Sequence, residues 1–313
     1  MENFSTRATT FEGEFEGERS RRRLRYPELS VAIESGLAGG TTLCQEGLLR
    51  KPRLLDRSKV LALGDRVDNL VRRMECLGRI RHHRRELECD SFANGETFFL
   101  NPAEIENEEG LARECSSVTI RDPFLNLPES IQLALHPRII GVASSYLGCI
   151  PVLSYIKIVK TFTSGFGPVD TQYFHRDIGS YWILKVFIYL NDVDTDGGPF
   201  CYARKSHITP RENDFGSNLY IRFADEKVVE MFGNENVVEC TGTAGDVWFA
   251  ETLGFHKGKR PRSAPRRIII ATFCVEKEKG FAYNPIKIKT SDLASLTPLQ
   301  RAVCSELEVV PGY

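Results

Sequence analysis

The sequence lacks the features of a membrane-spanning or secreted protein. No run of about 18 or more apolar residues occurs in it, so no membrane span is expected. Residues 1–18 carry acids where a secretion signal has a basic end followed by an apolar run. The nine cysteines include no CxxC pair, which leaves a zinc ribbon or a thioredoxin-like motif without support. Odd, dispersed cysteines are typical of reduced thiols, and we predict a cytoplasmic protein.

The sequence also lacks a strong charge of either sign. Its formal net charge is −1 over 313 residues, so no overall field would collect nucleic acid or an anionic membrane. With 42% hydrophobic and 27% charged residues, the composition is that of an ordinary globular protein. Residues 1–25 are polar and include a basic run from Arg19 to Arg23. We predict a flexible arm there and a single domain over 26–313.

Helical spacing of apolar residues dominates the first half of the domain. The stretch 54–80 places apolar side chains on one helical face, and Gly64 is expected to break it. A second helix is expected over 102–114. A third is expected over 128–147, split by Pro137 and ended by Gly148. These segments make 26–150 a mainly helical part.

From Pro151 the pattern changes to short segments rich in β-branched and aromatic residues. Strands are predicted over 152–162, 183–190, 199–204, 245–250 and 266–275. Helices do not alternate with them, so a doubly wound α/β fold is disfavoured. We predict a mainly β fold with flanking helices and a double-stranded β-helix, or jelly-roll, core over 151–280. A C-terminal extension over 281–313 includes a helix over 294–308.

A candidate metal site lies at His175 and Asp177. Residues i and i+2 of a strand point to the same face, so both side chains would enter one cavity. A distant second histidine, His256, would complete the 2-His-1-carboxylate face that holds Fe(II) and leaves positions open for O₂ and a co-substrate. The His-x-Asp pattern alone also fits a strand-end histidine hydrogen-bonded to a nearby aspartate.

Two arginines follow His256 at the start of the last predicted core strand. Arg266 or Arg267 could bind the far carboxylate of 2-oxoglutarate bidentately, although an arginine pair can also be a solvated strand start. The two point to opposite faces, so one of them can have this role. Gln172 could bind a ligand or have a plain structural role.

Lys185 shares a strand face with Tyr189, and this face would line the cavity. A buried lysine needs a partner, which could be a substrate acid, the co-substrate or a neighbouring aspartate. Lys157 and Lys160 lie on opposite faces of the strand 152–162, so at most one of them points inward.

The segment from Leu135 to Phe273 resembles the phytanoyl-CoA dioxygenase family of Fe(II)/2-oxoglutarate oxygenases. Four pieces match in order: LALHPRIIGVASSYLG (133–148), QYFHRD (172–177), KVFIYLNDVDTDGGPFCYARKSH (185–207) and GDVWFAETLGFHKGKRPRSAPRR (245–267). The segment that contains them covers a little under half of the chain. Lys205 replaces the glycine that the family usually has before Ser206-His207, which alters a turn.

The resemblance implies that His175, Asp177 and His256 hold Fe(II), and it favours Arg266 over Arg267 as the 2-oxoglutarate residue. It implies oxidation of an unactivated C–H of a small-molecule substrate, with decarboxylation of 2-oxoglutarate to succinate. Asp177 favours oxygenation, because related halogenases lack this carboxylate. Two alternatives stay open: a cupin-like metal enzyme without 2-oxoglutarate, and a non-catalytic jelly roll that serves as an interaction module.

Overall fold

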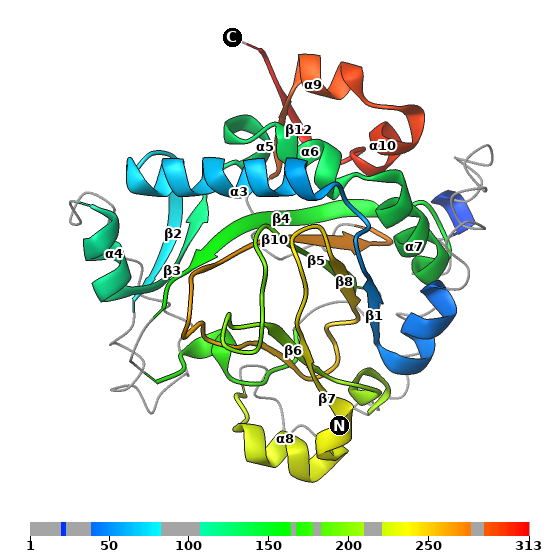
Figure 1. Cartoon of the computed structure of the whole chain (residues 1–313). Coiled ribbons are helices and arrows are strands. Elements are labelled where there is room, and N and C mark those ends of the chain that lie inside the picture. Colours follow the sequence, from blue (N-terminus) through cyan, green and yellow to red (C-terminus); the bar gives the residue numbers. More distant parts are fainter. Residues whose placement is uncertain are drawn as a thin grey trace, which may run out of the picture.

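The computed structural model describes residues 20–22, 39–82, 107–163, 167–177, 183–209, 221–276 and 285–312. Two antiparallel sheets face each other, as in a jelly roll (Figure 1). The larger has the order β1-β8-β5-β10-β4-β3-β2, and the smaller has the order β7-β6-β9. The predicted fold class is thereby confirmed.

The strands have the following bounds. The larger sheet consists of β1 (Leu48–Lys51), β2 (Leu77–His82), β3 (Cys115–Ile120), β4 (Val152–Thr161), β5 (Ile183–Tyr189), β8 (Val247–Ala250) and β10 (Arg266–Cys274). The smaller sheet consists of β6 (Phe200–Ala203), β7 (Val237–Cys240) and β9 (His256–Gly258). Near the C-terminus, β11 (Lys287–Lys289) and β12 (Glu308–Val310) form a separate parallel pair.

Most of the helices cover the outer face of the larger sheet, whereas α8 lies beyond the smaller sheet (Figure 1). Their bounds are α3 (Arg57–Arg72), α4 (Glu108–Glu114), α5 (Pro123–Asn126), α6 (Glu129–Ala134), α7 (Pro137–Leu147), α8 (Asp225–Phe232), α9 (Thr290–Ser295) and α10 (Pro298–Val303). No helix in the described ranges is long and apolar enough to cross a membrane.

The alternation along β5 divides the core into two layers. Leu184, Val186 and Ile188 belong to the apolar cluster that includes side chains of the helices. Phe187 and Tyr189 belong to a second cluster, which fills space between the two sheets. Successive side chains of a strand point to opposite faces, so this pattern predicts which face of β5 looks into the cavity.

The helix predicted over 128–147 is confirmed together with its break. It forms as α6 and α7, with Pro137 at the first position of α7. Gly148 ends α7 in the left-handed conformation, at a φ of 70°, which glycine adopts without steric cost. All five predicted core strands are present, each with bounds within two residues of the expected ones.

The prediction for 54–80 is wrong in two respects. Helix α3 runs through Gly64 without a break. A Cβ at this position would lie 2.6 Å from the carbonyl oxygen of Leu190, so the glycine allows the helix to approach the sheet closely. Residues 77–82 form strand β2 instead of helix, and β2 pairs with β3.

Two other predicted helices differ in their bounds. Helix α4 begins at Glu108, where Asn107 caps it by accepting a hydrogen bond from the N–H of Gly110. The start expected at 101–102 lies outside the described residues. The helix expected over 294–308 is instead α10 alone, because α9 ends at Ser295 and β12 begins at Glu308.

The end of the predicted N-terminal arm contacts the domain. Residues 20–22 are helical, and Arg22 is 3% exposed. Its guanidinium donates to the carbonyl oxygens of Ile150 at 2.6 Å, Pro151 at 3.1 Å and Ala302 at 3.3 Å. The remainder of residues 1–25 lies outside the described part of the chain.

Candidate metal and co-substrate site

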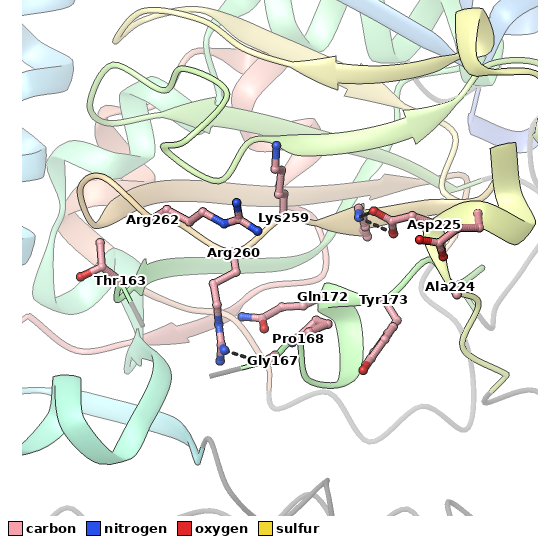
Figure 2. Close-up of a pocket in the computed structure, with 12 residues that line it drawn as sticks. Thr163, Gly167, Pro168, Gln172, Tyr173, Ala224, Asp225, Lys259, Arg260 and Arg262 are labelled. Atoms are coloured by element: carbon pink, nitrogen blue, oxygen red, sulfur yellow. Dashed lines mark hydrogen bonds and ion pairs between the residues drawn. The ribbon is translucent and has the colours of Figure 1, made fainter. Parts of the chain in front are cut away.

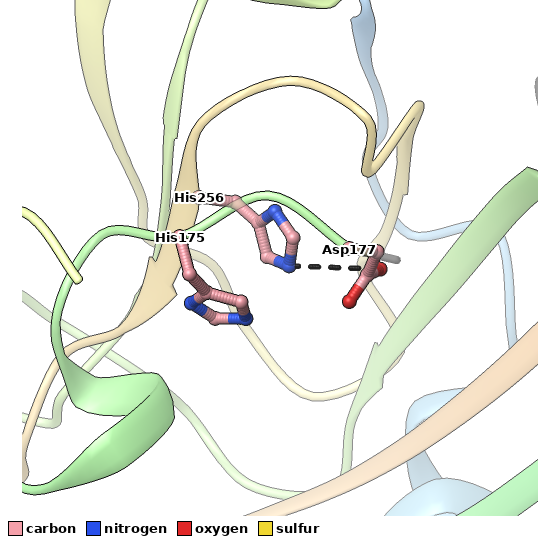
Figure 3. A group of neighbouring side chains, drawn as sticks. All are labelled: His175, Asp177 and His256. Carbon is pink, nitrogen blue, oxygen red and sulfur yellow. Dashed lines mark ion pairs between the residues drawn. The ribbon is translucent and has the colours of Figure 1, made fainter. Parts of the chain in front are cut away.

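The structure brings His175, Asp177 and His256 together, with one potential ligand atom of each within 4.8 Å of the others (Figure 3). His175 and His256 exchange two backbone hydrogen bonds of 2.9 Å. The N–H of Asp177 donates to the carbonyl oxygen of Thr252 at 2.9 Å. The segment that holds the His-x-Asp pattern is therefore paired with the segment that holds the distal histidine, and this pairing sets the spacing of the three side chains.

Both imidazoles are oriented by backbone carbonyl groups. Nδ1 of His175 lies 3.0 Å from the carbonyl oxygen of Tyr173, and Nδ1 of His256 lies 2.9 Å from that of Gly254. A carbonyl oxygen accepts a hydrogen bond, so Nδ1 carries the proton in each ring. In a neutral imidazole Nε2 then keeps its lone pair, which is the arrangement that metal-binding histidines have.

The charges of the three groups suit a divalent cation. Burial lowers the pKa of both histidines, to about 4 for His256 and well below its ordinary value for His175. Burial alone would raise the pKa of Asp177, but the Lys185 ammonium and the two histidines together hold it far below its usual value. At neutral pH the site thus offers two neutral imidazoles and one carboxylate.

This donor set fits Fe(II). Two imidazoles and a carboxylate form the facial triad of non-haem Fe(II) oxygenases, which leaves coordination positions for a co-substrate and for O₂. The three side chains lie at a cavity of about 300 Å³ between the two sheets, which is also lined by Phe187, Phe200 and Ile268.

Arg266 is a buried cation at the same cavity. It is 8% exposed, and burial lowers its pKa. It donates to the carbonyl oxygen of Gly198 and lies 3.3 Å from Oγ1 of Thr161. No carboxylate pairs with it in the described ranges, and its Nε has no hydrogen-bond partner there. A buried guanidinium surrounded by neutral oxygens would be stabilised by a carboxylate ligand.

Arg267 lies on the opposite face of β10. Its guanidinium forms an ion pair with Asp68 of α3, and its backbone N–H donates to Oδ1 of Asn191 at 2.7 Å. It does not line the cavity. Of the two arginines that the sequence left as candidates, Arg266 is therefore the one available to a ligand of the cavity.

Comparison with known proteins agrees with this geometry. The sequence profile of the phytanoyl-CoA dioxygenase (PhyH) family matches residues 43–269, which is well over half of the chain. The chain belongs to the phytanoyl-CoA dioxygenase family. The recognition and the enzyme class predicted from the sequence, an Fe(II)- and 2-oxoglutarate-dependent dioxygenase, are confirmed at the level of this family. No curated protein matches the chain.

Solved structures with the same fold include three at 17–18% identity. The epimerase SnoN from nogalamycin biosynthesis, described as α-ketoglutarate dependent, has a TM-score of 0.56 and 18% identity, over 81% of this chain and 88% of its own. The carbocyclase SnoK from the same biosynthesis has a TM-score of 0.50 and 18% identity, over 76% and 83%. EctD from S. alaskensis, solved with bound Fe, has a TM-score of 0.52 and 17% identity, over 87% and 86%. At this identity the likeness establishes the fold.

Lys205, which replaces the glycine usual in the PhyH family, lies in a turn of this family member. Lys205 adopts the left-handed conformation, at a φ of 62°, which a glycine adopts with less strain. Ser206 follows it, and the Ser206 hydroxyl donates to the carbonyl oxygen of Ala203 at 2.5 Å and accepts from the N–H of Phe255 at 2.8 Å. The turn is therefore attached to the residue before His256. Nε2 of His207 lies 3.0 Å from the carbonyl oxygen of Cys44, which is a structural contact.

Two further predicted site residues also line the cavity. Oε1 of Gln172 accepts from the N–H of Val169 at 3.0 Å, so its amide stabilises the turn that precedes His175. The ammonium of Lys185 lies 2.5 Å from Oδ2 of Asp177. Of the three partners considered for Lys185, the structure thus has the neighbouring aspartate.

Sequence reasoning missed Thr161 and left Lys157 undecided. Thr161 ends β4 directly opposite Arg266 and lines the cavity with it. Lys157 also lines the cavity, whereas Lys160 on the other face forms ion pairs with Asp68 and Glu108. The period of two along β4 would have paired Thr161 with Lys157 once the inward face was known.

A second, larger hollow of about 970 Å³ adjoins the cavity and shares Gln172 and Lys257 with it (Figure 2). Several of its lining side chains are basic. The ammonium of Lys257 lies 2.5 Å from the Asp225 carboxylate, and that of Lys259 lies 2.6 Å from Glu239. These two charges are thus already balanced by acidic side chains.

Proposed function

We propose that this family member is an Fe(II)- and 2-oxoglutarate-dependent dioxygenase that hydroxylates an unactivated C–H bond of a small molecule. One oxygen atom of O₂ would enter the product. The other would enter succinate as 2-oxoglutarate loses CO₂. The observation that carries the proposal is the convergence, in one cavity, of a neutral-His₂-carboxylate triad and a buried arginine surrounded by neutral oxygens.

The residues that line the cavity would divide the work of this reaction among them. His175, Asp177 and His256 would hold the metal, which supplies the O₂ chemistry when bound. Arg266, with the hydroxyl of Thr161, would bind the far carboxylate of 2-oxoglutarate through a charge-assisted pair. The aromatic rings of Phe187 and Phe200, whose centroids lie 3.9 Å apart, would keep water from the cavity.

Arg266 also separates this proposal from the two alternatives. A cupin-like enzyme without 2-oxoglutarate needs no buried arginine at the cavity. A non-catalytic interaction module needs neither the arginine nor the triad. Burying a guanidinium beside neutral oxygens costs free energy. The buried Arg266 therefore favours a function in which a bound ligand places a carboxylate against this guanidinium.

The decisive experiment is an anaerobic titration of the apoprotein with Fe(II) and 2-oxoglutarate. We expect the visible metal-to-ligand charge-transfer band of the chelate, and we expect it to be lost in His175→Ala and Asp177→Ala. His136→Asn is the matched control, because it removes a histidine outside the cavity and keeps a residue that can cap α7. This control should keep the band.

Other outcomes would point to the alternatives. If Fe(II) binds but the charge-transfer band does not appear, 2-oxoglutarate is not a co-substrate, and the cupin-like enzyme becomes the favoured alternative. If no metal binds, the triad has been assigned wrongly. Once a substrate is found, a product that has gained one oxygen atom supports hydroxylation, whereas the loss of two hydrogens would indicate desaturation or ring formation.

A further inference from the structure

One turn of the chain, residues 251–254, contacts both segments that carry the triad. The carbonyl oxygen of Thr252 accepts a hydrogen bond of 2.9 Å from the N–H of Asp177. The carbonyl oxygen of Gly254 lies 2.9 Å from Nδ1 of His256. Two of the three proposed metal ligands are therefore held by carbonyl groups of the same turn.

The middle of this turn makes a third contact. The carbonyl oxygen of Leu253 accepts from Nε of Arg176. In the sequence this arginine lies between His175 and Asp177. The turn thus contacts the His-x-Asp segment at two points and the distal histidine at one. Because metal affinity depends on how neighbouring groups orient the ligands, a displacement of this turn would weaken metal binding.

A buried carboxylate holds the turn in place. Glu251 is 2% exposed, and its Oε1 accepts from the N–H of Leu253 at 3.2 Å. Its Oε2 accepts from the hydroxyl of Tyr146, which belongs to α7. Hydrogen bonds to a charged acceptor are stronger than those between neutral groups, and a buried carboxylate requires them. The Glu251 side chain therefore connects helix α7 to the middle of the turn.

Tyr146 is suited to this contact. Burial and the adjacent Glu251 carboxylate raise the pKa of Tyr146 well above its ordinary value, so the phenol stays protonated and donates. The backbone of Glu251 has separate partners. Its N–H donates to the carbonyl oxygen of Gly47 at 2.9 Å, and its carbonyl oxygen accepts from the Tyr202 hydroxyl at 2.9 Å. These backbone contacts do not need the carboxylate, so the path of the chain should survive replacement of the side chain.

We propose that Glu251 is a positioning residue of the metal site, with Tyr146 as its partner. Its carboxylate fixes the turn whose carbonyl groups orient Asp177 and His256. Neither Glu251 nor Tyr146 lines the cavity, so both act through the turn and not by contact with a ligand. The inference rests on the proposed function only for the role of the triad as the metal site, and it does not depend on 2-oxoglutarate.

The test measures Zn(II) affinity without 2-oxoglutarate, by competition with a chromophoric chelator. Tyr146→Phe removes the donor to the carboxylate, and Glu251→Leu removes the carboxylate. We expect each to weaken Zn(II) binding by about tenfold or more, the lower end of the effect of groups that orient metal ligands. Glu251→Gln keeps an oxygen that can accept from Leu253 and an N–H that can donate to the Tyr146 hydroxyl. This variant should bind Zn(II) within about threefold of the wild type.

Tyr189→Phe is the matched control. The Tyr189 hydroxyl is also buried, and it donates to the carbonyl oxygen of Cys240 at 2.6 Å. Tyr189 is the last residue of β5, whereas Ala250, directly before the turn, pairs near the start of that strand. The urea concentration at half-unfolding should fall in Tyr189→Phe as in Tyr146→Phe, because both lose a buried hydrogen bond. Zn(II) affinity should fall in Tyr146→Phe and not in the control.

The possible failures are distinct. If the wild-type protein binds no Zn(II), the triad has been assigned wrongly and the inference falls with it. If Zn(II) binds but the charge-transfer band with Fe(II) and 2-oxoglutarate is absent, the proposed function alone is overturned. The inference about Glu251 is overturned if Tyr146→Phe binds Zn(II) as tightly as the wild type, or if Tyr189→Phe loses as much affinity. Tyr146→Phe decides this even if Glu251→Leu does not fold.

Discussion

The ammonium of Lys185 lies 2.5 Å from Oδ2 of Asp177, the same oxygen that lies 3.8 Å from Nε2 of His256. A cation therefore adjoins the carboxylate oxygen that faces the rest of the triad. Two opposite effects on metal binding follow. The lysine orients the carboxylate, a contribution typically worth about ten- to a hundredfold in affinity, but its charge also repels a metal ion. Each pair of unit charges about 4 Å apart interacts by about 4 kcal/mol near a protein surface, so repulsion should be the larger effect.

We therefore expect Lys185→Met to bind Zn(II) or Fe(II) at least about tenfold more tightly than the wild-type protein in the absence of 2-oxoglutarate. Competition with a chromophoric chelator measures the affinity. Lys59→Met is the control for the loss of one positive charge from the exposed surface. Weaker metal binding in Lys185→Met would mean that orientation of Asp177 outweighs repulsion.

Arg266 and Arg267 allow a matched comparison, because they are neighbours on opposite faces of one strand. Arg266→Gln should weaken 2-oxoglutarate binding by roughly ten- to a hundredfold, as expected for the loss of a charge-assisted hydrogen bond. Arg267→Gln should leave this affinity unchanged, and it should lower the free energy of unfolding because Asp68 loses an ion-pair partner. Titration of the charge-transfer band and urea unfolding measure the two effects. Equal losses of 2-oxoglutarate affinity would contradict the assignment of Arg266.

Much of the site could be predicted because it depends on the period of two along strands. This period placed His175 beside Asp177, separated Arg266 from Arg267 and assigned Lys185 to the cavity. The partner of Lys185 could not be chosen in this way, because it depends on how β5 lies relative to Asp177. Sequence spacing carries no information on such a contact between segments.

The wrong predictions in the helical part also arise from contacts between segments that are distant in the sequence. Leu77 and Ile80 continue the apolar spacing of the helix before them, yet they belong to β2, because pairing with β3 is a tertiary interaction that local spacing does not reveal. Gly64 has a low helix propensity, but its close contact with the sheet overrides that preference.

The buried histidines should make the apoprotein sensitive to mild acid. The pKa of His256 is lowered from 6.5 to about 4, mainly by burial, so the folded state keeps the ring neutral where the unfolded state binds a proton. The neutral His256 ring therefore contributes to the free energy of unfolding. This contribution is fully present above pH 6.5 and is lost as the pH falls towards 4, by on the order of 3 kcal/mol in total. Urea unfolding of metal-free protein between pH 7.5 and 4.5 should show this loss. His256→Gln should make the free energy of unfolding less dependent on pH in this range, and an unchanged pH dependence would contradict the prediction.

The close contact at Gly64 predicts opposite effects of one substitution in two settings. In a peptide that corresponds to α3, Gly64→Ala should increase helicity, because alanine is favoured over glycine by about 1 kcal/mol in a helix. In the whole protein the same change should lower the free energy of unfolding by about 1–2 kcal/mol, because the new methyl group would meet the Leu190 carbonyl at 2.6 Å and overpacking outweighs the gain in propensity. Circular dichroism of the peptide and urea unfolding of the protein test the two halves. Ala62→Gly, at an exposed position of the same helix, should destabilise both, by about 1 kcal/mol. A Gly64→Ala protein more stable than the wild type would show that the helix and the sheet can move apart without cost.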